Sequence, residues 1–277
     1  MNIIDFHTHV FPDDLAPRAI AQLIENAPVM QNHTDGTMNG LKQSMKQNNI
    51  SHSVTLSIAT KPSQVTAINK TCARNPEKGI FQFGTLHPET ENFEEEIDRL
   101  VETGIRGIKF HPEYQDFHVD DFRIYPMYES LASSGLIVVF HTGKDPGPFS
   151  CDHALPHAIR QVRRDFPRLR MVAAHMGGWM VWDRVEEVLL GEDILFDTSA
   201  IYHLMNPETF VRLCRRHGTD RILFGTDSPW YDQGECVRWI EKTRLSDEEK
   251  EAVLSGNARR ELGLQSAPEV NFTSGME

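Results

Sequence analysis

The chain has 277 residues, of which 39% are hydrophobic and 25% charged, and its 28 Lys and Arg against 40 Asp and Glu give a formal net charge of -12. A chain of this length can bury a sizeable core, and the ordinary apolar content argues against disorder. The acidic balance argues against nucleic acid and anionic membrane as partners, because both select basic protein surfaces.

The sequence also predicts a cytoplasmic protein. Its apolar runs are far shorter than the roughly 20 residues that span a bilayer, and residues 1–7 lack the basic region of a signal peptide. The four cysteines form no Cys-x-x-Cys pair. This spacing favours free thiols in a reduced compartment.

Short apolar runs alternate with amphipathic stretches along the whole chain. Apolar residues three to four positions apart predict helices around 93–101, 158–166, 181–189 and 210–214. Eight β-α repeats in about 250 residues predict a single (β/α)8 TIM barrel, residues 1–263, rather than a doubly wound open sheet. The eight candidate strands are residues 3–7, 53–58, 80–86, 105–110, 136–141, 169–175, 194–197 and 221–226.

The end of the chain divides into a helix and a tail. Ser246 and Glu249 form the pattern of a capping box, which predicts a last helix over residues 247–262. Residues 264–277 read as a loose C-terminal tail.

Polar side chains end several of the predicted strands, and alternation predicts the face that each occupies. In the first strand His7 and His9 share a face with Asp5, opposite Ile4 and Phe6. In a parallel barrel the strand ends meet at one mouth, where active sites form. The residues expected on the corresponding face of other strands are Gly107, Lys109 and His111, then Ile137, Val139 and His141, then Met171, Ala173 and His175, and finally Leu223, Gly225 and Asp227.

This convergence predicts a site for one divalent metal ion. His7 and His9 project from the same strand face, so both imidazoles can bind one ion. His141 and Asp227 complete three nitrogens and one oxygen, a set that suits Zn²⁺ first, with Mn²⁺, Fe²⁺ and Ni²⁺ as alternatives. A bound ion lowers the pKa of its water to about 7. Each residue alone has an ordinary structural explanation, but uncompensated polar groups rarely gather on one barrel face.

Five segments that carry these residues resemble the amidohydrolase superfamily, in particular its amidohydrolase 2 branch. This branch includes the aminocarboxymuconate-semialdehyde decarboxylase-like enzymes. The resemblance spans nearly all of the predicted barrel, in the order that the family has. The matching segments are IDFHTH at 4–9, GIKFHP at 107–112, VFHTG at 139–143, AHMGG at 174–178 and LFGTDSP at 223–229.

The resemblance implies roles for the polar residues. His7, His9, His141 and Asp227 correspond to the ligands of one metal ion. His175 corresponds to the acid or base beside the metal-bound water, and Asp227 doubles as the acceptor of a proton from that water.

Lys109 has three interpretations. Binuclear members of the superfamily carry a carbamylated lysine on the fourth strand, where it bridges two metal ions. The match to the mononuclear branch favours a single ion, and Lys109 is then a candidate to bind a substrate carboxylate. An ordinary buried ion pair is the third interpretation. His111 and Trp230, expected near the mouth, are further candidates for substrate binding.

These expectations define three candidate functions. The first is a metal-dependent hydrolase that cleaves an amide, ester or lactone of a small acidic or cyclic metabolite with metal-activated water. The alternative is a nonoxidative decarboxylase (lyase) of an aromatic or muconate-type acid, disfavoured because the family's decarboxylases tend to be longer than this chain. A non-catalytic metal-binding barrel is the third, and His175 argues against it, because a structural metal site needs no nearby base. The expected partner is a small molecule, and a homodimer is an open alternative to a monomer.

Overall fold

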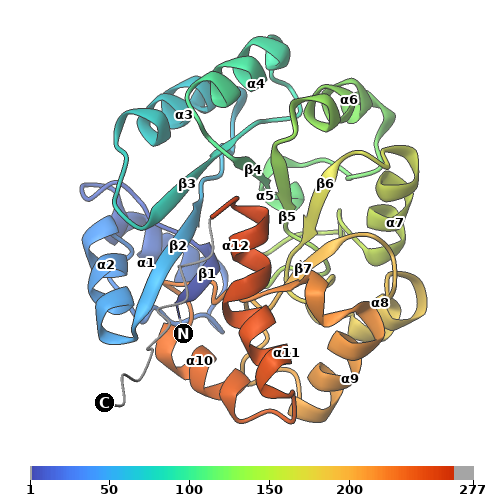
Figure 1. Ribbon diagram of the computed structural model, residues 1–277. Coiled ribbons are helices and arrows are strands. Elements are labelled where there is room, and N and C mark those ends of the chain that lie inside the picture. Colours follow the sequence, from blue (N-terminus) through green and yellow to red (C-terminus); the bar gives the residue numbers. More distant parts are fainter. Residues whose placement is uncertain (1, 265–277) are drawn as a thin grey trace, which may run out of the picture.

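The eight apolar runs form eight parallel strands, each paired with its neighbours in the order β1 to β8 (Figure 1). The computed structural model describes residues 2–264. The predicted (β/α)8 barrel is therefore confirmed, and the predicted tail lies outside the described residues apart from Leu264. The strands are β1 Ile3–Thr8, β2 Ile50–Leu56, β3 Ile80–Thr85, β4 Gly107–Phe110, β5 Ile137–Phe140, β6 Arg170–Ala173, β7 Leu195–Asp197 and β8 Ile222–Leu223.

Helices surround the strands, and the four segments with helical spacing correspond to α4, α7, α8 and α9. Their apolar faces pack on the outside of the barrel, as amphipathic helices do. The described helices are α1 Ala16–Asn26, α2 Met38–Gln47, α3 Val65–Arg74, α4 Phe93–Glu102, α5 Pro112–Gln115, α6 Tyr125–Ser134, α7 Pro156–Asp165, α8 Trp182–Val188, α9 Pro207–His217, α10 Gln233–Glu241, α11 Asp247–Glu251 and α12 Asn257–Glu261.

The predicted last helix is divided into two. Ser246 caps α11 by accepting a hydrogen bond from the Glu249 amide at 3.2 Å, and the Glu249 carboxylate accepts one from the Ser246 amide at 2.7 Å. The predicted capping box is thus confirmed. A π-helical turn over Ala252–Gly256 then joins α11 to α12.

Backbone hydrogen bonds close the barrel between its first and last strands. The Phe6 amide donates to the Phe224 carbonyl at 2.7 Å, and the Asp227 amide donates to the His7 carbonyl at 2.8 Å. These bonds hold the segment after β8 against the end of β1. Asp227 is therefore fixed beside His7 although 220 positions separate them in the sequence.

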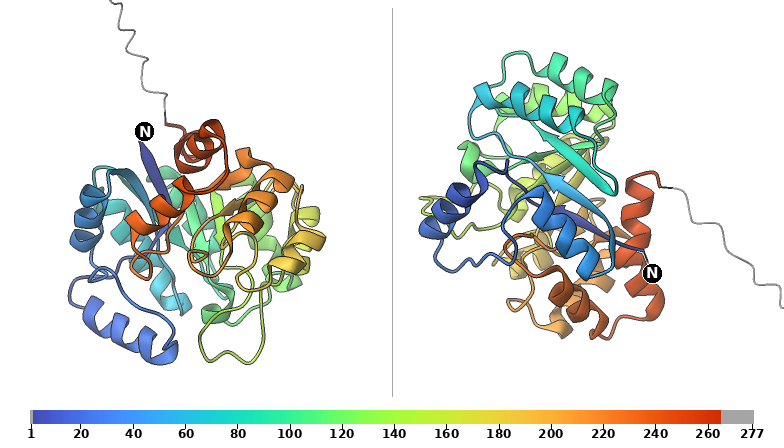
Figure 2. Two further views of the ribbon diagram at one scale, coloured as in Figure 1. Left: turned by 90° about the horizontal axis from the view of Figure 1, so that it is seen from below. Right: turned by 90° about the vertical axis from the view of Figure 1, so that its left-hand side faces the viewer.

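The hydrophobic core has two layers, one inside the barrel and one between the barrel and its helices. Ala258 and Leu262 belong to the inner layer, so α12 and the residue after it close one end of the barrel. Figure 2 shows α1 and the loop after β5 at the opposite end from α12. The inner layer comprises Ile4, Phe6, Val54, Leu56, Phe83, Ile137, Val139, Val172, Leu223, Ala258 and Leu262.

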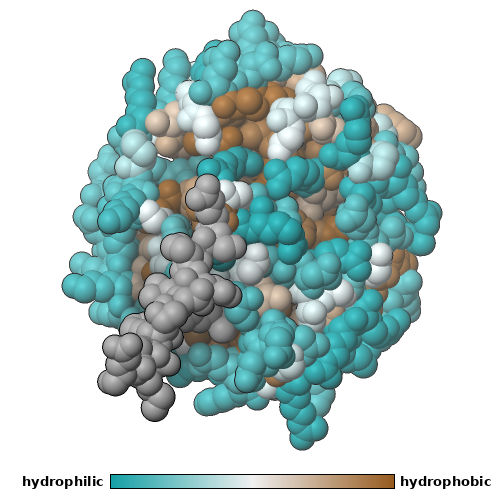
Figure 3. All heavy atoms as spheres, in the orientation of Figure 1, coloured by the Kyte–Doolittle hydropathy of each residue, from teal (hydrophilic) through white to brown (hydrophobic). Residues whose placement is uncertain are grey.

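The face that carries α12 is largely hydrophilic, with hydrophobic side chains visible between the helices (Figure 3). Within residues 2–264, no helix is both long enough and apolar enough to cross a membrane.

The faces predicted for β1 are wrong. Ile4 and Phe6 fill the barrel interior, and the Asp5 carboxylate instead accepts hydrogen bonds from Thr226 Oγ1 at 2.6 Å and from Gln233 of α10 at 2.7 Å. The pairing of β1 with β2 shifts register between Asp5 and Thr8. Such an irregularity re-aims side chains, and it brings His7 back to the interior.

The faces predicted for β6 are also wrong, whereas the alternation predicted for β4, β5 and β8 is confirmed. Val172 lies in the inner layer, and Met171 and Ala173 pack toward the helices. The strand ends at Ala173, and His175 follows with a left-handed φ of 59°. This turn, rather than strand alternation, directs His175 to the mouth.

Replacement of Phe6 by alanine tests the inner layer. Phe6 is fully buried and packs edge-on against Phe83, with 5.8 Å between ring centroids. We expect Phe6→Ala to lower the free energy of unfolding by about 3–5 kcal/mol, because it leaves a cavity in a closed barrel. Chemical denaturation measures this change.

Phe122→Ala is the matched control, because Phe122 is 79% exposed. We expect it to change the free energy of unfolding by less than about 0.5 kcal/mol. Equal effects of the two substitutions would contradict the two-layer description of the core.

Candidate active site

The polar residues meet in a cavity of about 600 Å³ at the carboxyl ends of the strands. This is the end of a TIM barrel where active sites form. Every residue that the sequence predicts for the site lines this cavity. They are His7, His9, Lys109, His111, His141, His175, Asp227 and Trp230.

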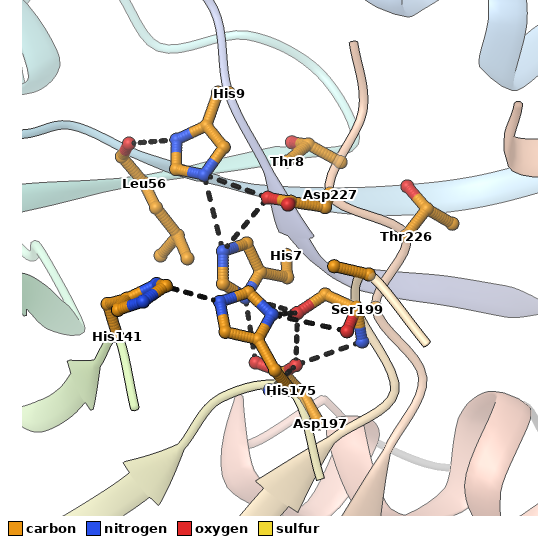
Figure 4. A network of polar contacts seen from close by, with 12 residues as sticks. His7, Thr8, His9, Leu56, His141, His175, Asp197, Ser199, Thr226 and Asp227 are labelled. Atoms are coloured by element: carbon orange, nitrogen blue, oxygen red, sulfur yellow. Dashed lines mark hydrogen bonds and ion pairs between the residues drawn. The ribbon is translucent and has the colours of Figure 1, made fainter. Parts of the chain in front are cut away.

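Three of the four predicted metal ligands lie together (Figure 4). His7 Nε2 is 3.2 Å from His9 Nε2 and 3.4 Å from Asp227 Oδ1, and His9 Nε2 is 3.2 Å from the same oxygen. Ligands bound at about 2.0–2.1 Å to one tetrahedral ion are separated by about 3.3 Å. The spacing of the three atoms therefore fits one divalent cation.

The positions of the ring protons on His7 and His9 also fit the binding of one cation. The Nδ1 of His9 is 2.9 Å from the Leu56 carbonyl, and the Nδ1 of His7 is 2.8 Å from Asp197 Oδ2. A carbonyl and a carboxylate accept hydrogen bonds only, so each Nδ1 carries the proton and each Nε2 presents a lone pair. Two lone pairs and a carboxylate oxygen that face one another repel unless positive charge lies between them.

The ionisation of these groups suits metal binding. Burial lowers the pKa of His7 to about 3, which keeps its imidazole neutral as a ligand must be. Burial acts to raise the pKa of Asp227, but the adjacent His9, His7 and His175 rings outweigh it and hold this pKa below its usual range.

His141 lies in a different group of side chains. Its Nε2 donates to the Lys144 carbonyl at 2.9 Å, and its Nδ1 is 3.0 Å from His175 Nε2. Its ligating atoms cluster with those of His111 and Asp145, apart from the group formed by the other three predicted ligands. The role of His141 as a fourth ligand stays a prediction.

Asp197 and Ser199 are functional candidates that the sequence reasoning missed. Asp197 Oδ2 accepts from His7 Nδ1, and Asp197 Oδ1 accepts from the His175 amide at 3.0 Å and from the Ser199 hydroxyl. Ser199 Oγ is in turn 2.8 Å from His175 Nδ1. Asp197 ends an apolar strand, as His141 does, so the same signal could have found it.

Lys109 is fully enclosed, and its Nζ lies 3.4 Å from His7 Nε2. Burial lowers the pKa of Lys109 to about 8, against the opposing charges of Asp197 and Asp227. Its amine therefore exchanges between charged and neutral forms near neutral pH. This is compatible with binding an anion and with carbamylation.

A second acidic group lies beyond His141. The His111 ring stacks on the His141 ring with 4.2 Å between centroids, and His111 Nε2 is 3.5 Å from Asp145 Oδ2. Glu113 Oε2 lies 3.9 Å from His141 Nε2. Burial raises the pKa of Glu113 to about 7 and that of Asp145 to about 6. These carboxyls can hold protons next to the imidazoles near neutral pH.

Aromatic side chains form much of the remaining cavity wall. Trp230 follows the Asp227 turn, and its amide donates to the Asp227 carbonyl at 2.9 Å. Trp179, Tyr202 and Tyr231 also line the cavity. Flat aromatic surfaces of this kind can stack on a planar ligand.

Comparison with known sequences gives two matches. The family model described as "Amidohydrolase" matches residues 4–264. The curated 2-amino-3-carboxymuconate-6-semialdehyde decarboxylase of Dictyostelium discoideum is 26% identical over 239 residues, which are 71% of this chain and 64% of that protein. The chain thus spans a little less than two thirds of the length of this relative.

Two solved structures have a similar fold. An uncharacterized TIM-barrel protein of Bordetella bronchiseptica has a TM-score of 0.73 and 22% identity, and the match covers 95% of this chain and 99% of that one. A dihydroxybenzoic acid decarboxylase of Polaromonas sp. JS666, solved with bound manganese and the inhibitor 2-nitroresorcinol, has a TM-score of 0.73 and 17% identity, with coverage of 98% and 100%.

These relatives correct the function expected from the sequence. Hydrolysis of an amide, ester or lactone is the first expectation, yet the curated sequence relative is a decarboxylase. The hydrolase expectation is wrong. Chain length was a poor guide because the site residues lie at strand ends, which a shorter chain retains, and a shared scaffold can host either chemistry.

Substitution of Asp197 tests its support of His7. An amide in place of the carboxylate weakens the hydrogen bond that fixes the His7 ring, so we expect Asp197→Asn to lower the affinity of the cavity for Mn²⁺ by about 10–100-fold. Titration of metal-depleted protein with Mn²⁺ measures this affinity.

Asp193→Asn is the control, because Asp193 is an exposed carboxylate that pairs with Arg163 on the surface. It should leave the Mn²⁺ affinity unchanged. Wild-type affinity in Asp197→Asn would show that His7 does not need this partner.

Proposed function

Because the chain belongs to the amidohydrolase family, we propose that it is a metal-dependent nonoxidative decarboxylase of a small aromatic or muconate-type acid. The observation that carries the proposal is the group of His7 Nε2, His9 Nε2 and Asp227 Oδ1, which shares a cavity with the imidazole of His175. The decarboxylase among the sequence relatives supports this reaction over hydrolysis.

The reaction breaks one bond between a carbon and a carboxylate group. The carboxylate leaves as carbon dioxide, and the electron pair of the broken bond takes up one proton at the same carbon. A divalent ion at the His7, His9 and Asp227 group, with Zn²⁺ and Mn²⁺ as the candidates, supplies positive charge that holds substrate oxygens and stabilises the electrons left behind.

His175 is the proposed proton carrier. Its Nδ1 is held by Ser199 Oγ at 2.8 Å, and its backbone amide is held by Asp197, so the direction of its ring is fixed. Its Nε2 is the ring nitrogen on the side of His141. Burial lowers the pKa of His175, which makes the protonated ring a better acid toward a substrate carbon.

Lys109 and the aromatic wall provide the proposed substrate contacts. The Lys109 ammonium lies next to the metal-binding group, where it can pair with the carboxylate that is lost. Trp230 and Tyr231 offer flat surfaces to a ring or a conjugated chain. The His111 ring stacks on the His141 ring, and its proposed role is to position that ring.

We propose one ion in the cavity, with Lys109 retained as an amine. One observation favours the binuclear alternative, in which a carbamylated Lys109 bridges a second ion. His141 Nδ1 and His175 Nε2 face each other at 3.0 Å, and the outer nitrogens of both rings meet oxygen acceptors. Mn²⁺ content per chain separates the two forms, because a bridged centre holds two ions.

Product analysis tests the reaction. Incubation of the metal-loaded enzyme with a panel of hydroxybenzoates and muconate semialdehydes should release carbon dioxide from at least one compound. In D₂O the product should carry one deuterium at the carbon that lost the carboxylate, because that carbon takes a proton exchanged with solvent. Turnover of amides, esters or lactones without release of carbon dioxide from any acid would contradict the proposal.

Replacement of His175 tests the proton carrier. We expect His175→Ala to keep its Mn²⁺ and to lower turnover by about 10²–10⁴-fold, the usual contribution of general acid–base catalysis. His7→Ala should lose the Mn²⁺ itself. Metal content and turnover are measured on the same samples.

His157→Ala serves as the control, since His157 is exposed on α7, and it should match the wild type in both measurements. Loss of Mn²⁺ from His175→Ala would instead make His175 a ligand.

A further inference from the structure

A second group of metal-ligating side chains lies outside the cavity, at the same end of the barrel. His118 stands in the segment between α5 and α6, and Cys151 and His153 stand in the segment between β5 and α7. One ligating atom of each lies within 4.8 Å of those of the other two. None of the three lines the cavity described above.

Two distances in this group are close to those between the ligands of a tetrahedral zinc ion. Cys151 Sγ is 3.6 Å from His153 Nε2, and Asp116 Oδ1 is 3.5 Å from the same nitrogen. Bonds of about 2.3 Å to sulfur and about 2.0–2.1 Å to nitrogen place the two ligand atoms about 3.6 Å apart at a tetrahedral angle. The His118 and His153 rings lie beside each other, with 4.8 Å between centroids.

The ligand types distinguish this group from the one in the cavity. One thiolate, two imidazoles and one carboxylate favour Zn²⁺, because sulfur ligands select borderline and soft ions over Mg²⁺ or Mn²⁺. Cys151, His118 and Asp116 are exposed, so an ion can enter directly from solvent.

Hydrogen bonds hold the two segments in place around the group. The His153 amide donates to Glu113 Oε1 at 3.1 Å, and the Val119 amide donates to the His153 carbonyl at 3.1 Å. These bonds fix the backbone at His153 and next to His118, so two of the ligands are brought near each other without an ion. Glu113 also links this group to the cavity wall, since its other oxygen faces His141.

We propose that His118, Cys151 and His153, with Asp116 as the fourth ligand, bind one Zn²⁺ ion at the rim of the barrel. Binding displaces the thiol proton of Cys151 to solvent and joins the segments that follow β4 and β5. This rim site is separate from the cavity ion, and it does not depend on the reaction proposed above.

Thiol labelling of the Mn²⁺-loaded protein tests the rim site. All four cysteines lie within the described residues, and Cys151 is exposed whereas Cys72, Cys214 and Cys236 are buried. A thiol reagent applied to the native protein therefore reports on Cys151. One equivalent of Zn²⁺ should slow this labelling at least about tenfold, because a coordinated thiolate is shielded from the reagent, and Mg²⁺ should have no effect. A labelling rate unchanged by Zn²⁺ would overturn the proposal.

Variants separate the rim site from the cavity. After exposure to Zn²⁺ and removal of the free ion, Cys151→Ser and His118→Ala should each hold one equivalent less than the wild type. Co²⁺ should give a thiolate-to-metal absorption band in the wild type and in His7→Ala, and no band in Cys151→Ser.

His157→Ala is the matched surface control and should keep both the Zn²⁺ and the band. Wild-type zinc content in Cys151→Ser, or a cobalt band that survives this substitution, would show that the thiol binds no ion.

Discussion

The hydrogen bond from His7 Nδ1 to Asp197 determines which nitrogen of His7 faces the cavity, and the rest of the site is arranged around it. Because Asp197 takes the proton-bearing nitrogen, Nε2 is left as a lone pair opposite His9 and Asp227. The second oxygen of the same carboxylate holds the backbone of His175. One buried aspartate at the end of β7 thus orients the His7 ring and the neighbouring imidazole of His175, so the distance between the two depends on a single rigid group.

The closure of the barrel supplies the other half of this arrangement. Asp227 reaches His7 because the segment after β8 is bonded to β1, and the left-handed backbone at Asp227, with φ of 69°, turns its carboxylate inward. Residues from both ends of the chain therefore meet only after the whole barrel has formed. This long sequence separation makes the proposed metal site a property of the complete fold rather than of any one motif.

The sequence predicted the fold and eight residues that line the cavity, but it missed Asp197 and Ser199 and failed on the direction of individual side chains. Eight apolar runs and their spacing predict the barrel because burial on both faces of a parallel strand leaves a clear pattern. The faces of β1 and β6 could not be derived in this way. A register shift redirects His7, and a left-handed turn redirects His175. Neither feature can be recognised from the alternation of hydrophobic residues in the sequence. Asp197 was visible as an acid at a strand end, but its partner in a distant strand was not.

The inner layer that ends in Ala258 and Leu262 limits the routes by which a small molecule can enter or leave the cavity. Because Ala258 and Leu262 pack in the inner layer, α12 closes the end of the barrel away from the cavity. In the proposed decarboxylation, the reactant would enter and both products would leave at the opposite end, between the loops after the strands. Carbon dioxide would leave there with little hindrance, whereas the larger organic product would have to leave before the next reactant binds. Release of that product, rather than cleavage of the bond, would then limit the turnover rate.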